Sequence, residues 1–273
     1  MPSPLRKKWY AFMLISNHRR FSRQRMLQLL DELEGAESPA TSLYIPHDLP
    51  ASEVEKTLKA PLGPGVAEVL SDISENATRS KVGAVIFWGE EDKYLVLPPF
   101  PVKEKLFASG YDVEPLRALL QQDLTVALIL LRLGAYAVGV FQGEKLVSSK
   151  VGTGLVHSRH KKGGSSAHRF ERHREKQIEY FFTRVCHHVQ ERLEPYLQQL
   201  DYVIYGGERH TLLSFRKQCH FLQQLDGRTL GTLLNVREPK QAALEAAITQ
   251  VWSSEVIQWQ DNEPSAVSGQ HSV

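Results

Sequence analysis

The sequence predicts an α/β protein of two folded domains, an α+β domain in the N-terminal half followed by a domain with a mixed sheet. Its 273 residues can form one large domain or two of ordinary size. In both halves, short apolar runs bounded by glycine or proline alternate with segments of helical periodicity. In the second half, three strand-like runs come before alternating helices and strands, which favours a mixed sheet with helices on its faces.

In the first half, apolar spacing predicts helices at 20–34, 52–60 and 66–76. Runs rich in β-forming residues predict strands at 41–46, 82–88 and 94–97, and a turn-rich segment joins the last two. Prolines at 98, 99 and 101 then interrupt regular structure, and short polar sequence follows. We place a domain boundary after this point, so that residues 1–117 form the N-terminal domain.

Residues 118–260 form the second domain in this interpretation. Strands are expected at 125–133, 135–141, 145–151, 202–205 and 229–236. A long amphipathic helix is expected from about Arg169 to Pro195, and further helices at 209–224 and 241–252. The polar residues 261–273 are expected to be a disordered tail.

The composition is that of an ordinary globular protein, with 42% hydrophobic residues, 23% charged residues and a net charge of +2. No apolar run approaches 18 residues, and polar residues follow the N-terminal basic cluster too soon for a signal peptide. We therefore expect a cytoplasmic protein without a membrane partner. Cys186 and Cys219 are expected to be two reduced thiols, because they form neither a disulfide framework nor a paired metal-ligand spacing.

The densest unusual feature is a basic segment from His157 to Lys176. It holds seven lysines or arginines and four histidines against two glutamates. Such a concentration on a nearly neutral chain is typical of a surface that binds a phosphate backbone. The alternative is a solvated run of charge without a nucleic-acid partner.

Two consecutive glycines, Gly163 and Gly164, lie inside this basic segment. Glycine permits backbone angles closed to other residues and lets the main chain approach another molecule closely. Exposed N–H groups of such a loop can donate to a phosphate or to an oxyanion. The alternative is a surface turn, in which glycine and serine are common.

The basic segment resembles the middle-domain signature of eukaryotic and archaeal-type class-1 peptide chain release factors, roughly H-x-K-G-G-Q-S-x-x-R-F-x-R. The residues that match it position by position are His160, Lys162, Gly163, Gly164, Ser166, Arg169, Phe170 and Arg172. The run AYAVGVFQGEKL at 135–146 and the long helix after the signature also fit that domain. In the first half, residues 41–46 and the run NATRSKVGAVIFW at 76–88 resemble the family's first domain.

The resemblance implies a ribonuclease-H-like middle domain whose loop enters the peptidyl-transferase centre of the large ribosomal subunit. There a backbone N–H stabilises charge that develops during hydrolysis of the peptidyl-tRNA ester. Gly163 and Gly164 would then shape the loop, and Ser165 would supply the N–H donor. No cofactor and no metal is implied. The residues expected to contact rRNA or tRNA are Arg159, His160, Lys161, Lys162, Ser166, Arg169 and Arg172.

Two departures from the family pattern modify this expectation. Ser165 replaces the family glutamine, and the printed chain has no counterpart of the third domain, which docks a translational GTPase. Both bring the sequence nearer to the release-factor-like peptidyl-tRNA hydrolases of ribosome quality control, which free nascent chains from stalled ribosomes or large subunits. Two alternatives stay open, a non-catalytic ribosome- or tRNA-binding surveillance factor of the same fold and a nuclease that cuts the tRNA 3′ end.

Other chemistries find less support in the residues. The histidines of the basic segment lack a compact ligand spacing with cysteine or carboxylate, and Ser165 and Ser166 lack the elbow motif of a serine nucleophile. Residues 78–81 match the family's codon-recognition loop only loosely. We therefore interpret them as the end of a helix before a strand, and we do not expect stop-codon decoding.

Overall fold

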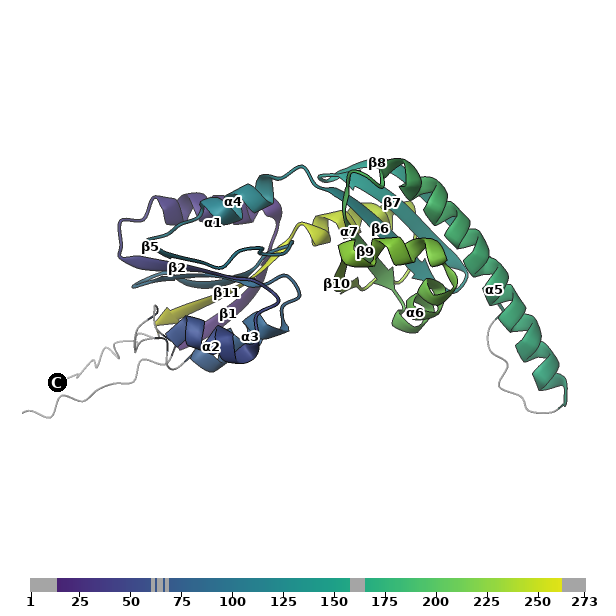
Figure 1. Ribbon diagram of the computed structural model, residues 1–273, viewed down its shortest axis with the longest axis horizontal. Coiled ribbons are helices and arrows are strands. Elements are labelled where there is room, and N and C mark those ends of the chain that lie inside the picture. Colours follow the sequence, from purple (N-terminus) through teal and green to yellow (C-terminus); the bar gives the residue numbers. More distant parts are fainter. Residues whose placement is uncertain (1–13, 60–61, 63–65, 67–68, 158–164, 262–273) are drawn as a thin grey trace, which may run out of the picture. The chain divides into compact units, whose positions relative to one another are not determined.

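The computed structural model describes residues 14–59, 62, 66, 69–157 and 165–261. These residues fold into two compact units (Figure 1). The first contains the chain up to Arg117 together with the segment from Ser254 onward, and the second contains Ala118–Ser253. Both units combine helices with a sheet, so the α/β class expected from the sequence is confirmed.

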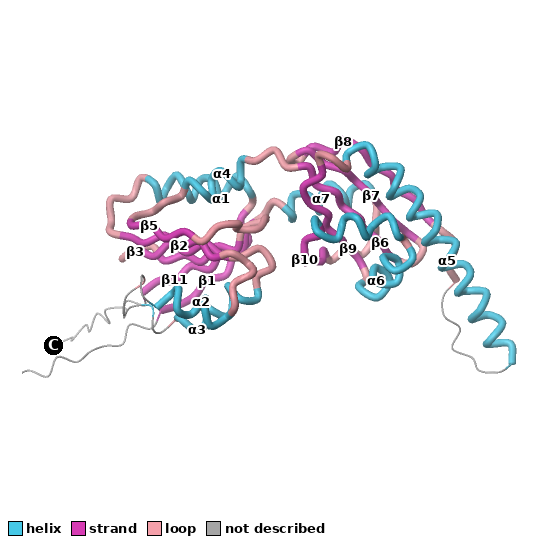
Figure 2. Tube along the Cα trace, in the orientation of Figure 1, coloured by secondary structure: helices cyan, strands magenta, loops and turns pink. Residues whose placement is uncertain are grey.

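The first unit is built on a six-stranded sheet in which all neighbouring strands are antiparallel. In spatial order the strands are β1 (Leu14–Phe21), β11 (Ser254–Asp261), β4 (Lys93–Leu97), β3 (Ala84–Gly89), β2 (Ala40–Ile45) and β5 (Leu106–Ser109). The helices are α1 (Arg23–Glu34), α2 (Ala51–Lys59), α3 (Leu70–Arg79) and α4 (Glu114–Gln121). Figure 2 shows α1 and α4 on one face of this sheet and α2 and α3 on the other.

Both faces of the first sheet are apolar, which explains why helices cover both. The α2 and α3 face forms one core with Leu43, Ile86 and Trp259, while Tyr44 and Phe87 point to the opposite face and meet edge to face. Helix α1 begins later than the expected residue 20. The side chain of Ser22 caps it by accepting a hydrogen bond from the backbone N–H of Arg25, and the residues before Ser22 belong to β1.

The strand β11 corrects the expected division of the chain. Residues 254–261 were expected to finish the second domain and to begin a disordered tail, but they pair with β1 and β4 in the first sheet. Residues 262–273 lie outside the described part of the chain, so disorder there stays a prediction. Three further elements, β1, β5 and α4, were not expected, because each is short or lacks a clear periodicity.

The second unit is built on a five-stranded mixed sheet. In spatial order its strands are β10 (Thr229–Leu234), β9 (Leu200–Gly207), β6 (Thr125–Arg132), β7 (Ala135–Gln142) and β8 (Lys145–Thr153). Strands β6, β7 and β8 are antiparallel, while β9 pairs in parallel with both β6 and β10. The mixed sheet and the three consecutive strands therefore agree with the sequence pattern.

The helices of the second unit are α5 (Ser165–Leu193), α6 (Arg209–Gln218) and α7 (Gln241–Val251), with two 3-10 segments at Glu194–Tyr196 and His220–Arg228. The expected helix at 209–224 ends early because Cys219 leaves the helical conformation and a 3-10 segment follows. The side chains of Phe181, Val185 and Val189 anchor α5 on the sheet. The first turns of α5 extend beyond the sheet (Figure 1), and residues 168–173 are exposed there.

The two cysteines correct a second expectation. Helices α5 and α6 pack together and bring the Cα atoms of Cys186 and Cys219 to 5.4 Å, and the two sulfurs form a disulfide. The expectation of two reduced thiols is therefore wrong for this structure. Local sequence patterns do not predict this pair, because the two residues lie 33 positions apart and meet only through helix packing.

None of the helices in the described ranges has both the length and the apolar character needed to cross a bilayer.

Candidate functional site

The candidate site lies where the chain passes from β8 into α5. The structure describes both flanks of this connection, through His157 on one side and from Ser165 on the other. Six of the predicted site residues fall between the flanks and so lie outside the described residues, namely Arg159, His160, Lys161, Lys162, Gly163 and Gly164. The remaining four, Ser165, Ser166, Arg169 and Arg172, belong to the first turns of α5.

Ser165 is the first residue of α5, which places its backbone N–H at a helix N-terminus. The first four N–H groups of an α-helix have no partner within the helix, and the helix dipole makes this end electropositive. The first turn of α5 contains no acidic residue that would oppose this potential. The backbone at Ser165 and Ser166 can therefore donate hydrogen bonds to an anion or to a developing negative charge.

A basic stripe extends from this helix end along the solvent-facing side of α5. Arg169, His173, Lys176 and Tyr180 are all exposed, and their spacing of three or four residues places them on one side of the helix. Tyr180 is 71% exposed, which is unusual for an aromatic ring. Glutamates 171, 175 and 179 repeat every four residues along a neighbouring stripe. The basic stripe is thus separated from most of the negative charge on the helix.

Arg172 flanks this stripe and is also exposed. Its Nε lies 3.5 Å from the carbonyl oxygen of His168, one turn earlier, so its guanidinium is held close to the helix surface. Together with Arg169, it presents two cations within the first turns of α5, where contact with phosphate groups is expected.

The chain that leaves β8 runs along α5 before it reaches the connection. Arg184 donates a hydrogen bond from Nη2 to the carbonyl oxygen of Thr153. A Cβ atom at Gly154 would come within 2.4 Å of the Phe181 ring, so the backbone there approaches the helix too closely for a larger residue.

Side chains of α5 then hold His157 against the helix. The backbone N–H of His157 donates to Oε1 of Gln177 at 3.2 Å, and Nε of Arg174 donates to the carbonyl oxygen of His157 at 2.9 Å. Nδ1 of His157 lies 2.8 Å from Nε2 of Gln177, which is also 3.3 Å from Nε2 of His173. Sequence reasoning missed this cluster, although polar residues at 173 and 177 on one helix side were a possible signal.

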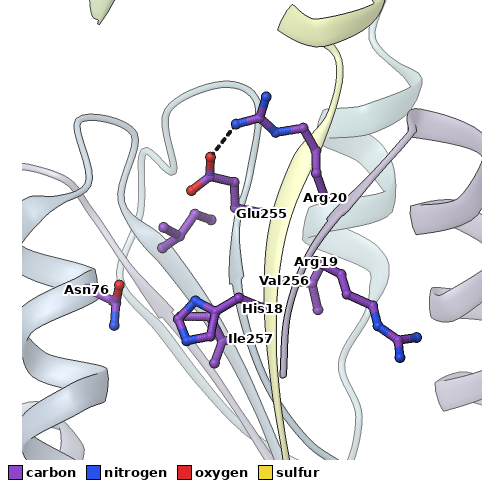
Figure 3. A pocket seen from close by; sticks show the side chains of 8 residues that line it. His18, Arg19, Arg20, Asn76, Glu255, Val256 and Ile257 are labelled. Atoms are coloured by element: carbon purple, nitrogen blue, oxygen red, sulfur yellow. Dashed lines mark hydrogen bonds and ion pairs between the residues drawn. The ribbon is translucent and has the colours of Figure 1, made fainter. Parts of the chain in front are cut away.

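The first unit carries a separate polar cavity of about 420 Å³. Figure 3 shows His18 and Arg20 of β1 and Glu255 of β11 beside Asn76 of α3. Nη2 of Arg20 lies 2.6 Å from Oε1 of Glu255, so these two charges form an ion pair with each other.

Residues 78–81 form an ordinary helix end. Helix α3 ends at Arg79, whose guanidinium pairs with Glu75 at 2.5 Å. The hydroxyl of Ser80 donates to the carbonyl oxygen of Gly83 at 2.6 Å and accepts from the N–H of Val82 at 3.3 Å. These contacts stabilise the turn into β3, which agrees with the expected structural role of the segment.

No group of three or more metal-ligating side chains occurs among the residues that the structure describes.

Comparison with known proteins links this geometry to a family. Residues 124–257, which cover most of the second unit and the start of β11, match a family model described as "Actinobacteria/chloroflexi VLRF1 release factor". The peptide chain release factor subunit 1 of Archaeoglobus fulgidus is 26% identical over 233 residues, which is 76% of this chain and 57% of the relative. The chain belongs to the class-1 release-factor-like superfamily.

Other members of the superfamily match over a similar length. Peptide chain release factor subunit 1-2 of Methanosarcina acetivorans is 26% identical over 238 residues, again 76% of this chain and 57% of the relative. The chain therefore spans a little over half of the length of these curated relatives.

Solved structures give weak whole-chain superpositions. The crystal structure of the archaeal translation termination factor aRF1 has a TM-score of 0.37 at 20% identity and covers 85% of this chain and 73% of its own. The structure titled "Vms1 mitochondrial localization core" has a TM-score of 0.39 at 13% identity and covers 77% and 95%. The superfamily assignment therefore depends on the family model and the sequence relatives.

Proposed function

We propose that this protein is a ribosome-associated, release-factor-like peptidyl-tRNA hydrolase that acts in the cytoplasm. It would free nascent chains from stalled ribosomes or large subunits by hydrolysing the ester bond of peptidyl-tRNA. One observation carries the proposal. The last eight residues of the release-factor signature, 165–172, form the N-terminal end of α5, which extends beyond the sheet.

The proposed chemistry uses a backbone donor. Gly163 and Gly164 would let the chain approach the ester closely, and the N–H of Ser165 would stabilise negative charge that develops in the transition state. The position of Ser165 at the start of α5 supports this role, because its N–H has no partner within the helix. The donor is a main-chain group, so it survives the replacement of the family glutamine by serine.

The basic residues of the site would bind RNA. Arg159, His160, Lys161, Lys162 and Ser166 would contact rRNA or tRNA near the glycines, and the stripe of α5 residues from Arg169 to Lys176 would extend this contact. The exposed ring of Tyr180 offers a surface for stacking with an unpaired base.

A substitution series at residue 165 tests the backbone role directly. Proline is tolerated at the first position of a helix but has no N–H, so Ser165→Pro removes the proposed donor and keeps the helix start. Ser165→Ala keeps the N–H and removes only the hydroxyl. We expect Ser165→Pro to slow release of peptide from purified stalled large subunits by roughly 10²–10³-fold, as for other lost oxyanion donors. We expect Ser165→Ala to slow it much less.

Glycine variants complete the test. Gly163→Ala and Gly164→Ala should abolish most release, whereas Gly227→Ala should retain it, because a Cβ at Gly227 meets no atom within 4 Å. Release that is equally fast in the wild type and in both loop variants would contradict the proposal.

A non-catalytic ribosome-binding factor is the second candidate, and Ser165 in place of the family glutamine is the observation that favours it. This candidate predicts that the wild type binds large subunits without releasing peptide. Sizing the released tRNA separates ester hydrolysis, which leaves the tRNA intact, from cleavage at its 3′ end.

A further inference from the structure

A hydrogen-bonded cluster on α5 holds the last described residue before the candidate loop. We call His157, His173, Arg174 and Gln177 the His157 clamp. Helix α5 contributes three of them, and His173 and Gln177 lie one turn apart on the same side of the helix. Both backbone polar groups of His157 have a side-chain partner in the clamp, since its N–H donates to Gln177 and its carbonyl oxygen accepts from Arg174.

We propose that the His157 clamp positions the connection between β8 and α5 for release by fixing the point at which the chain leaves the surface of α5. The proposal rests on the function proposed above and adds positioning residues to it. None of the four residues touches the ester in this mechanism.

The contacts hold both the backbone and the ring of His157 beside α5. Gln177 accepts from the backbone N–H through Oε1 at 3.2 Å, and its Nε2 lies 2.8 Å from Nδ1 of the same residue. Nδ1 of His157 also lies 3.0 Å from Oε1 of Gln177, so both polar atoms of the amide are within reach of the ring. The rings of His157 and His173 lie side by side with centroids 6.5 Å apart. A single amide therefore orients one backbone group and two imidazoles.

The clamp lies close to the start of α5. Along α5, His173 lies about 12 Å from Ser165. The clamp thus fixes His157, the last described residue before the connection, beside α5. Without it, the nearest anchors before the connection would be Val156, which packs against the core, and Gly154, whose N–H donates to the carbonyl oxygen of Gly134.

The clamp is separate from the hydrophobic core of the second unit. His157 and His173 are exposed, and Arg174 and Gln177 are only half-buried. The fully buried side chains of α5 begin at Phe181, one turn beyond Gln177. Hydrogen bonds at such a surface add little to global stability, so the contacts can be removed without unfolding the domain. Because the clamp adds little to stability, we assign it a role in placing the connection.

The test uses full-length protein and the variant Gln177→Leu, which has a similar volume and no amide. Gln177→Glu is the conservative rescue, because its carboxylate still accepts from the N–H of His157. The matched control is Gln218→Leu. The Gln218 amide ties α6 to Glu179 and Thr183 of α5, remote in sequence from the connection.

The first measurement is hydrogen exchange of the amides at residues 155–157. We expect Gln177→Leu to speed this exchange about tenfold and Gln177→Glu to restore most of the protection, while Gln218→Leu leaves it unchanged. Unchanged exchange in Gln177→Leu would show that Gln177 does not hold the backbone of His157.

The second measurement is peptide release from stalled large subunits at saturating protein. We expect Gln177→Leu to lower the rate at saturation at least tenfold, because a misplacement of about 1 Å can cost far more than this. The concentration for half-saturation and the thermal midpoint should stay close to those of the wild type. Faster exchange with an unchanged release rate would overturn the positioning role.

The two measurements also separate this inference from the proposed function. If the wild type releases no peptide, the proposed hydrolase is wrong and with it the positioning role, while the exchange experiment still decides whether the clamp exists.

Discussion

Cys186 on α5 and Cys219 at the end of α6 are joined by a disulfide, which links the helix that carries the candidate site to the next helix along the chain. The bond closes a loop of 33 residues. In the chain-entropy description, such a crosslink stabilises the folded state by roughly 3–4 kcal/mol, because it restricts the unfolded chain.

We therefore expect reduction, or the double change Cys186→Ser and Cys219→Ser, to lower the free energy of unfolding of the second unit by about that amount. Urea unfolding with and without reductant measures the difference, and the double variant should no longer respond to reductant. Alkylation of both thiols in native protein kept free of reductant would show that the bond does not form.

Gly207 is predicted to be essential for the second unit. Its φ of +118° lies in the region that favours glycine, and an added Cβ would lie 2.1 Å from the carbonyl oxygen of Leu131 on the neighbouring strand. We expect Gly207→Ala to cost roughly 3 kcal/mol or more of unfolding free energy. Gly227→Ala is the control and should change stability by less than about 0.5 kcal/mol. Equal stability of the two variants would contradict the local geometry.

Arg117 is predicted to stabilise the first unit by joining α4 to α1. Its guanidinium lies within 2.5, 2.6 and 2.9 Å of carboxylate oxygens of Asp31, Glu34 and Glu114, and its side chain is only 16% exposed. We expect Arg117→Met to lower the unfolding free energy by roughly 1–2 kcal/mol, because a network of charge-assisted bonds is lost.

The control for this network is Arg79→Met. Arg79 pairs only with Glu75 in the described structure, and its side chain is 76% exposed. Such pairs contribute about 0.3–0.5 kcal/mol. Chemical denaturation of the two variants at low and high salt should show a larger loss for Arg117→Met under both conditions.

Alkaline pH is predicted to unfold the protein through its buried tyrosines. Burial raises the pKa of Tyr205 to about 12, and it raises the pKa of Tyr44 and Tyr94 above the ordinary value as well. Unfolded tyrosine ionises near pH 10. The stabilisation by the neutral folded form is therefore complete below about pH 10 and is lost as the pH rises toward about 12.

Tyrosinate absorbance and circular dichroism, followed together through an alkaline titration, measure this effect. We expect a late fraction of the tyrosines to ionise only as the secondary structure is lost. Complete ionisation near pH 10 in a protein that stays folded would contradict the buried environment of these rings.

Several elements were predictable because the signal for each is local. The three strands of the second unit and the long helix after them agree with apolar spacing, and the signature at 160–172 identified the superfamily before any geometry was known. The site residues from Arg159 to Gly164 lie outside the described structure, so their roles stay predictions.

Local patterns in the sequence predict the class of fold, the core faces of the main helices and strands, and the position of the candidate loop along the chain. These features are encoded by residues a few positions apart, whose side chains share one face of a helix or a strand. Which distant segments meet depends instead on the packing of whole elements. Arg20 and Glu255 pair across 235 positions where β11 returns to the first sheet, Cys186 meets Cys219, and His157 meets Gln177. The physical reason is that such contacts form when packing brings whole elements together, so no local periodicity records them.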